Sequence, residues 1–203
     1  KKYKEFSNYY SLDDGTAEAA YGVNVAGAKV AMRFTIAEED TLTAVQMHFE
    51  QNLEDASSSP FMITIWNDIN GNTGDIIYQN GISFVEYTYE KNGFCEYQLD
   101  ESVIVDGSIF IGWEQSYSQL LNIGLDKNII NNENRMRYNT GSAWDTSSCL
   151  ECLGTWMIRP VFGSVSSVNN ILSMESSDIY PNPTNSIVTI EFSDAFSFNI
   201  YNL

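Results

Sequence analysis

The sequence has few cysteine, histidine and basic residues. Its 203 residues include three cysteines, one histidine (His48) and ten lysines and arginines against 27 aspartates and glutamates, which gives a formal net charge of −17. Nucleic acid and anionic membrane surfaces are poor partners for such a chain, because both repel negative charge. Histidine-dependent nucleophilic catalysis has one candidate base, and the alternation of apolar and polar residues around His48 predicts that its side chain points to solvent. We therefore expect no histidine-dependent nucleophilic catalysis from this chain.

Long apolar runs are also lacking. No run approaches the roughly 18 residues that a membrane-spanning helix requires, so we expect no transmembrane segment. The chain opens on Lys1 without the charged region and following apolar region of a signal peptide. We expect either that a signal peptide has been removed or that the sequence is a piece of a longer protein.

The cysteines do not complete a familiar metal or redox motif. Cys149 and Cys152 form a Cys-x-x-Cys pair, but a structural zinc site needs four ligands and only Cys95 and His48 remain. The pair lies among turn-forming residues, whereas a thioredoxin-like pair opens a helix after a strand. A structural disulfide formed in an oxidising compartment is the better interpretation, with the pairing open and Cys95 among the candidates.

Alternation of apolar and polar residues with a period of two dominates the sequence, and convincing helical spacing is lacking. Val45, Met47 and Phe49 share one face of an expected strand, and Phe61, Ile63 and Ile65 share a face of another. Further strands are expected at about 28–36, 84–90, 94–99, 108–115, 122–126 and 155–162. Tight turns of antiparallel hairpins are expected at Asn70-Gly71, Asn80-Gly81, Asn92-Gly93 and Asp106-Gly107.

This pattern predicts an all-β fold, an antiparallel β-sandwich of jelly-roll type over residues 1–163. The Ser/Asn-rich stretch 164–178 has little to bury and is typical of a linker. Two more strands are expected at 186–192 and 196–203, within a C-terminal segment 179–203. Two strands are too few for an independent domain.

Two oxygen-rich loops are candidate calcium sites. The first contains Asp68, Asn70 and Asp75. An EF-hand loop would have glycine in place of Thr73 and glutamate in place of Gln79, so a plain hairpin turn is the preferred interpretation. The second loop contains Asp13, Asp14 and Glu18. Calcium is the one cofactor that the sequence leaves open.

Four aromatic side chains are candidates for a sugar-stacking surface, namely Trp66, Trp113, Trp144 and Tyr117. Trp113 shares a strand face with Ile109 and Ile111, which favours packing in the core. Trp144 follows a small-residue loop and is the better candidate for a ligand contact, together with Tyr117.

The C-terminal segment carries a specific motif. Tyr180-Pro181-Asn182-Pro183 is followed by the strand-like segments 187–192 and 200–203. In this order the three parts resemble the type A C-terminal sorting domain of type IX secretion cargo, an Ig-like β domain of which the chain holds the N-terminal part. The resemblance implies a Bacteroidetes-type protein that crosses the periplasm, is exported by the type IX machinery of the outer membrane, and is released or attached to the cell surface.

Residues 9–163 are similar to a β-sandwich module that precedes this sorting domain in large surface proteins and some secreted peptidases, notably at 13–22, 112–115, 122–126 and 157–163. The resemblance implies a non-catalytic, adhesive or structural role, with a carbohydrate or a surface protein as ligand. The alternative is an accessory domain of a secreted peptidase or glycoside-active enzyme whose catalytic domain lies upstream. Asp40-Thr41-Leu42 resembles the acceptor for O-glycosylation in such bacteria, with Thr41 as the modified residue.

Overall fold

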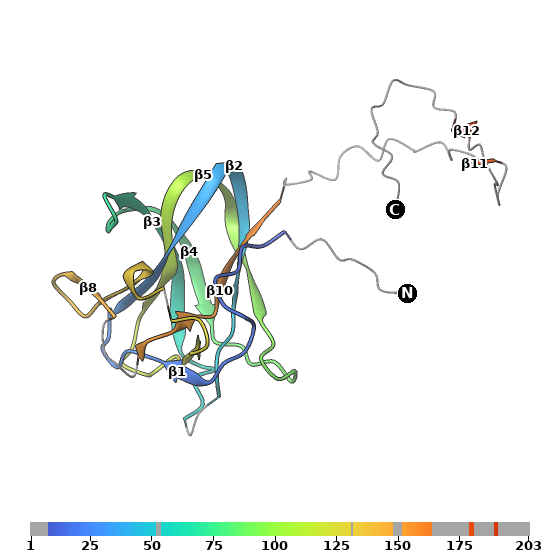
Figure 1. Cartoon of the computed structure of the whole chain (residues 1–203). Coiled ribbons are helices and arrows are strands. Elements are labelled where there is room, and N and C mark those ends of the chain that lie inside the picture. The colour runs from blue at the N-terminus through green and yellow to red at the C-terminus, as the bar shows by residue number, and fades with distance from the viewer. Residues whose placement is uncertain are drawn as a thin grey trace. The chain divides into compact units, whose positions relative to one another are not determined.

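The structure is a computed structural model of the chain, and it describes residues 8–51, 54–130, 132–147 and 152–163 together with two short C-terminal strands (Figure 1). The chain divides into two compact units, Lys1–Val165 and Ser166–Leu203. Among the described residues of the first unit there are ten strands and one 3₁₀ turn, η1 (Glu133–Arg135). The prediction of an all-β chain with antiparallel sheets is confirmed. The expected linker at 164–178 lies outside the described residues.

The larger sheet is built around two long strands that pair antiparallel along most of their length, β2 (Lys29–Met47) and β5 (Cys95–Gln115). Beside β5 lie β3 (Pro60–Ile69) and then β4 (Asn72–Phe84) at the edge, and beside β2 lie β7 (Met136–Asn139) and β8 (Trp144–Thr146). β7 pairs with the first part of β2, whereas β10 (Ile158–Phe162) pairs with its last part. β2 therefore has partners on both sides at its two ends, over Lys29–Met32 and Leu42–Met47.

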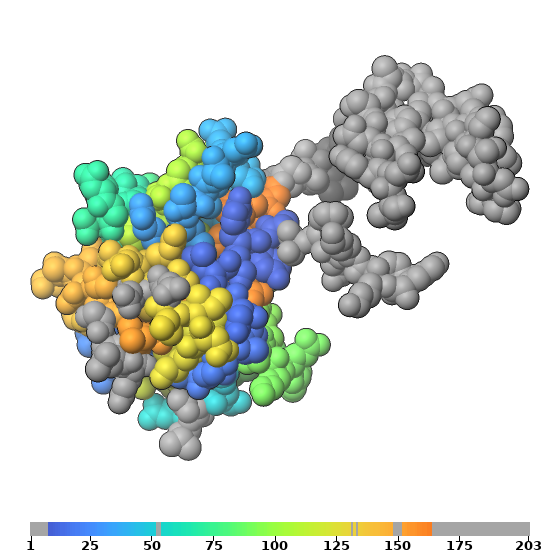
Figure 2. Space-filling view, viewed as in Figure 1, coloured from blue at the N-terminus to red at the C-terminus, as the bar shows by residue number. Residues whose placement is uncertain are grey.

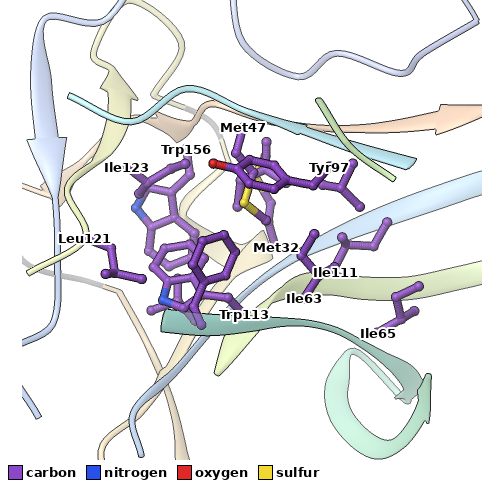
Figure 3. Packing of buried hydrophobic residues seen from close by; sticks show 14 of the residues in the cluster. Met32, Met47, Ile63, Ile65, Tyr97, Ile111, Trp113, Leu121, Ile123 and Trp156 are labelled. Carbon is purple, nitrogen blue, oxygen red and sulfur yellow. The ribbon is translucent and has the colours of Figure 1, made fainter. Parts of the chain in front are cut away.

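A smaller antiparallel sheet contains β1 (Ala19–Tyr21), β6 (Ile123–Asp126) and β9 (Thr155–Trp156) in the order β1-β6-β9. Side chains of both sheets form one hydrophobic core (Figure 3). Trp113 from β5, Ile123 from β6 and Trp156 from β9 are all fully buried in it. Each large apolar side chain contributes about 1.5–3 kcal/mol when it is buried. The prediction that Trp113 belongs to the core is confirmed.

Two of the four predicted turns lie inside strands. The expected strands 28–36 and 45–49 belong mostly to one strand, β2, and 94–99 and 108–115 belong to β5. Asp106-Gly107 lies within β5, where Gly107 has a φ of 67° beside a shift in the β2–β5 register. Asn80-Gly81 lies within β4. Both turn predictions are wrong because pairing with a neighbouring strand continues across these dipeptides, so tertiary contacts override the local turn preference.

The other two predicted turns are confirmed. Asn70 and Gly71 join β3 to β4 with φ values of 56° and 83°, as a two-residue type I′ hairpin turn requires. Asn92 has a φ of 58°, and the Gly93 N–H donates to the Glu90 carbonyl at 3.0 Å, which closes a turn before β5. The strand expected at 84–90 is wrong, because β4 ends at Phe84 and an irregular segment follows.

β4 is an edge strand of the larger sheet and is irregular along its pairing with β3. The register shifts three times, between Met62 and Thr64, between Ile65 and Trp66, and between Trp66 and Asp68. At each shift β4 advances by one residue more than β3, so that β4 carries three extra residues. Such bulges bend a strand and disrupt the flat row of hydrogen-bonding groups at a sheet edge.

The second unit contributes two short strands to the described residues, β11 (Ile179–Tyr180) and β12 (Thr189–Ile190). They pair antiparallel, with Ile179 opposite Ile190 and Tyr180 opposite Thr189. β12 lies within the strand expected at 186–192. The strand expected at 196–203 lies outside the described residues.

Candidate functional site

His48 lies at the centre of a polar site at the end of β2. Phe49 still packs in the core with Val45 and Met47, so His48 lies on the opposite side, but Phe94 and Gly124 cover it there and it is only 5% exposed. The prediction that His48 points to solvent is therefore wrong. Its ring fits against Gly124, where an added Cβ would lie 2.6 Å from the imidazole carbon Cδ2.

Both ring nitrogens of His48 have partners. Nδ1 lies 2.6 Å from the Gly93 carbonyl oxygen, and Nε2 lies 2.9 Å from Oε1 of Glu50. A carbonyl oxygen only accepts, so Nδ1 must donate its proton there. Nε2 is then the ring nitrogen that faces the Glu50 carboxyl group. The Glu50 side chain is 40% exposed, so the pair faces solvent on its acidic side.

The segment 85–94, between β4 and β5, is held in place beside this pair. The Glu86 N–H donates to the Tyr97 hydroxyl at 3.0 Å, and the Ala56 N–H donates to the Tyr87 hydroxyl at 2.9 Å. At the other end of the segment, Asn92 accepts a hydrogen bond from the Ala17 N–H. The backbone of the segment is thereby fixed on both sides of residue 89. Figure 2 shows this green segment projecting from the surface beside the blue N-terminal segment.

Two hollows meet at Glu50 and Gln51. The first has a volume of about 270 Å³ and the second about 280 Å³. The first is lined by residues 48–51 and 87–92, and the second by residues 17–20 together with Glu50 and Gln51. Their lining is rich in carboxylate, amide, hydroxyl and tyrosine groups, which can orient a small polar ligand. We refer to the two hollows together as the Glu50 groove.

Tyr89 is the most exposed aromatic residue of the groove. Its relative accessibility is 110%, so its ring is wholly in solvent although it lines the first hollow. Sequence reasoning missed Tyr89, His48 and Glu50 as site residues. The pattern Tyr87-Thr88-Tyr89 suggested a strand, and the groove joins segments that are far apart in the sequence.

The structure brings two of the predicted calcium ligands together and separates the third. The Asn128 side-chain amide donates to Asp14 Oδ2 at 2.9 Å and to Glu18 Oε1 at 3.1 Å. Asp13 instead binds Arg159, with both partners buried. Hydrogen bonds from the Thr16 side chain and backbone lower the pKa of Asp14 below its ordinary value. Among the described residues no group of three or more His, Cys, Asp or Glu side chains is arranged to hold a metal ion.

The second predicted calcium loop is the hairpin turn between β3 and β4. The Asp68 carboxylate binds the Arg33 guanidinium and accepts a hydrogen bond from the Gly71 N–H. Asn70 occupies the turn itself, and Asp75 lies on β4 with its side chain exposed. A cation at Asp68 would therefore compete with Arg33.

The predicted ligand-contact residues lie away from the Glu50 groove. Trp144 on β8 is half-buried and packs edge-on against Trp66, with the ring centres 5.2 Å apart. Trp66 is 2% exposed, which leaves it no surface for stacking a ligand. Tyr117 is 63% exposed and follows β5. Neither Trp144 nor Tyr117 lines the two hollows.

Thr41, the predicted O-glycosylation residue, lies in the middle of β2. It is half-buried, opposite Ile104 of β5, and its carbonyl accepts a hydrogen bond from the Gly163 N–H. Of the cysteines, Cys95 has a free thiol and Cys152 is disulfide-bonded. The expectation of a disulfide is confirmed, and Cys95, one of the candidates left open, is not part of it.

The first unit is thus an all-β module with a polar groove, and the described residues of the second unit form a strand pair at the sorting motif. Tyr180 lies on β11, while Pro181, Asn182 and Pro183 lie outside the described residues. Residues 178–203 match the family described as the secretion system C-terminal sorting domain. This match supports a type IX sorting tail and export through the type IX secretion system to the cell surface or the extracellular space.

No curated protein and no solved structure matches the chain. In the part of the chain that the structure describes, no helix is long and apolar enough to span a membrane.

Proposed function

We propose that this chain is a non-catalytic, adhesive or structural module of a Bacteroidetes-type surface protein. It crosses the periplasm, and the type IX machinery of the outer membrane recognises its C-terminal tail. The observation that carries the export part of the proposal is the match of residues 178–203 to the sorting-domain family. In this proposal β11 and β12 begin an Ig-like sorting domain, and the first unit is a sandwich of jelly-roll type. The two antiparallel sheets that share one core support the latter assignment.

The hydrogen bonding of His48 supports a non-catalytic role. Its two ring nitrogens contact a backbone carbonyl and the Glu50 carboxylate. Among the described residues, no serine, threonine or cysteine side chain forms a hydrogen bond with the ring, so the arrangement of a histidine-activated nucleophile is lacking there. The alternative, an accessory domain of a secreted peptidase or glycoside-active enzyme, is favoured by the Glu50 groove, because such domains serve by holding a substrate.

Export can be tested in a bacterium that possesses a type IX secretion system. The protein carrying an epitope tag is compared with a variant in which Pro181 and Pro183 are both replaced by alanine and with one lacking residues 178–203. We expect the unaltered protein at the cell surface or in the medium and both variants in the periplasm, measured by immunoblotting of cell fractions. Tyr117→Ala is the matched control and should be exported normally.

A host without a working type IX machinery should retain every form in the periplasm. Equal export of the form lacking residues 178–203, or export from the host without the machinery, would contradict the proposal.

A further inference from the structure

We propose that the Glu50 groove binds a neutral oligosaccharide, with the Tyr89 ring as the stacking surface and Glu50 and Gln51 as the hydrogen-bonding groups. This inference rests on the proposed function of the module as a binding module and names the class of its ligand.

The exposure of Tyr89 is the first observation that points to a ligand. A ring in water gains none of the roughly 1.5–3 kcal/mol that burial of a large apolar side chain provides, so Tyr89 does not stabilise the fold. The segment around it is nevertheless fixed, because Tyr87 and Asn92 are both hydrogen-bonded to other parts of the chain. The fixed backbone thus holds an exposed tyrosine ring beside the first hollow, where the ring can pack against an apolar surface of a ligand. The C–H face of a pyranose ring is such a surface, and a tyrosine ring stacks on it while its hydroxyl stays in water.

The second observation is the polar lining next to the ring. Glu50 offers a carboxylate oxygen and Gln51 offers an amide, on neighbouring residues that line both hollows. Adjacent acceptor and donor groups suit the paired hydroxyls of a sugar ring. His48 holds the Glu50 carboxylate from the buried side, which keeps it in one orientation. Each hollow, of about 270–280 Å³, is close to the lower end of the range of small-molecule sites, about 300–1,000 Å³.

The charges of the groove select a neutral ligand. Oε1 of Glu50 lies 2.9 Å from Nε2 of His48, and Glu90 is followed in the sequence by Lys91. The Glu18 carboxylate accepts hydrogen bonds from the Lys127 N–H and from Asn128. The Glu50 and Glu18 side chains are thus both engaged by other groups of the chain. An anionic sugar would be repelled by the net charge of −17.

Affinity electrophoresis of the full 203-residue chain tests the proposal. The protein is run in native gels that contain soluble starch, galactomannan or arabinoxylan, with alginate as the anionic comparison. We expect at least one neutral polysaccharide to slow the protein and alginate to have no effect. Tyr89→Ala should weaken the association constant about ten-fold, which corresponds to 1.4 kcal/mol. Its melting temperature should be unchanged, because the ring is wholly exposed.

Two further variants sharpen the test. Glu50→Gln removes the charge of the carboxylate and should also weaken binding. Tyr117→Ala removes another exposed tyrosine outside the groove and should bind as the unaltered protein does. The proposal is overturned if none of the three neutral polysaccharides slows the protein, if alginate alone does so, or if Tyr89→Ala and Tyr117→Ala behave alike. Cell fractionation is independent of this result, so loss of sugar binding with normal export removes this inference and leaves the export proposal intact.

Discussion

The carboxylate of Asp14 is surrounded by hydrogen-bond donors. Thr16 donates to Oδ1 through both its hydroxyl, at 2.6 Å, and its backbone N–H, at 2.9 Å. The Asn128 amide donates to Oδ2. These bonds favour the charged form, and the Thr16 hydroxyl makes the largest contribution to the lowered pKa of Asp14. Asp14 is therefore ionised at neutral pH, which is the form that binds a divalent cation.

Calcium binding at the loop of Asp14 and Glu18 remains a prediction. We expect the melting temperature to be higher in calcium than in a chelator at matched ionic strength, because a ligand that binds the folded state stabilises it. The measurement is thermal unfolding followed by circular dichroism. Asp14→Asn should abolish the difference, whereas Asp145→Asn, a change at an exposed carboxylate on β8, should preserve it. An unaltered protein that melts at one temperature in both buffers would disprove the prediction.

His48 shows where residue patterns stop being informative. The alternation correctly buries Val45, Met47 and Phe49 and assigns His48 to the opposite face. That face is not open to solvent at His48, because the ring contacts Gly93 and Glu50 there. A partner 45 positions away in the sequence, as Gly93 is, leaves no local signal. The groove could not be predicted from the sequence for this reason.

At the level of elements, a buried ion pair joins the N-terminal segment to β10. Arg159 of β10 donates to both carboxylate oxygens of Asp13, at 3.1 and 2.5 Å. The Asp13 side chain is fully buried and the Arg159 side chain is 11% exposed. The guanidinium also lies over the rings of Tyr9 and Phe94, 4.9 and 3.9 Å from their centres. Planar stacking of this kind suits arginine and not lysine.

We expect Asp13→Ala to lower the free energy of unfolding by about 3–5 kcal/mol, because it leaves the Arg159 charge buried without its partner. Lys29→Met, which removes a half-exposed pair with Glu114 at 3.8 Å, is the matched control and should cost about 1 kcal/mol or less. The measurement is urea unfolding, extended to a double-mutant cycle with Arg159→Met. A loss no larger than that of the control would show that the pair does not hold the segment.

Strand positions were more predictable than strand ends. The apolar faces of β3 and β5 follow from alternation, as the burial of Phe61, Ile63 and Trp113 confirms. The joining of two expected strands into β5 does not follow, because Asp106-Gly107 has the local preference of a turn. Its continuation depends on pairing with β2, which is more than 60 positions earlier in the sequence. The local sequence indicates a preference for a turn at this dipeptide, but pairing with the partner strand determines whether a turn or a bulge forms.

For the whole molecule, one buried and three half-buried acidic groups make stability depend on alkaline pH. Burial raises the pKa values of the Tyr21, Tyr87 and Tyr97 phenols and of the Cys95 thiol. In the unfolded chain these groups lose their protons near their ordinary values, about 8.5 for the thiol and 10 for the phenols. At pH values between the ordinary pKa of each group and its raised pKa in the folded protein, the folded state binds more protons than the unfolded state. Stability therefore falls as pH rises through this range and is fully present below it.

We expect the urea midpoint of unfolding to decrease steadily above about pH 9. Tyr97→Phe removes one of the buried phenols, together with the hydrogen bond that its hydroxyl accepts from the Glu86 N–H. This variant should be less stable at neutral pH but lose less stability at alkaline pH. The phenolate absorbance of the folded protein provides the check that the groups stay protonated. Two results would contradict the attribution of this pH dependence to the phenols and the thiol. One is a urea midpoint that does not change with pH, and the other is a Tyr97→Phe variant whose midpoint falls with pH as steeply as that of the unaltered protein.

The three extra residues of β4 affect whether copies of the protein can associate through their sheet edges. When copies of a protein are present at high local density, two flat sheet edges can pair through backbone hydrogen bonds. The continuous sheet that results can grow into fibres. A strand that is bent at three places offers a neighbouring copy only short, misaligned rows of donors and acceptors. The net charge of −17 keeps the copies apart at longer range. The geometry of β4 therefore disfavours edge-to-edge association of copies, independently of whatever the groove binds.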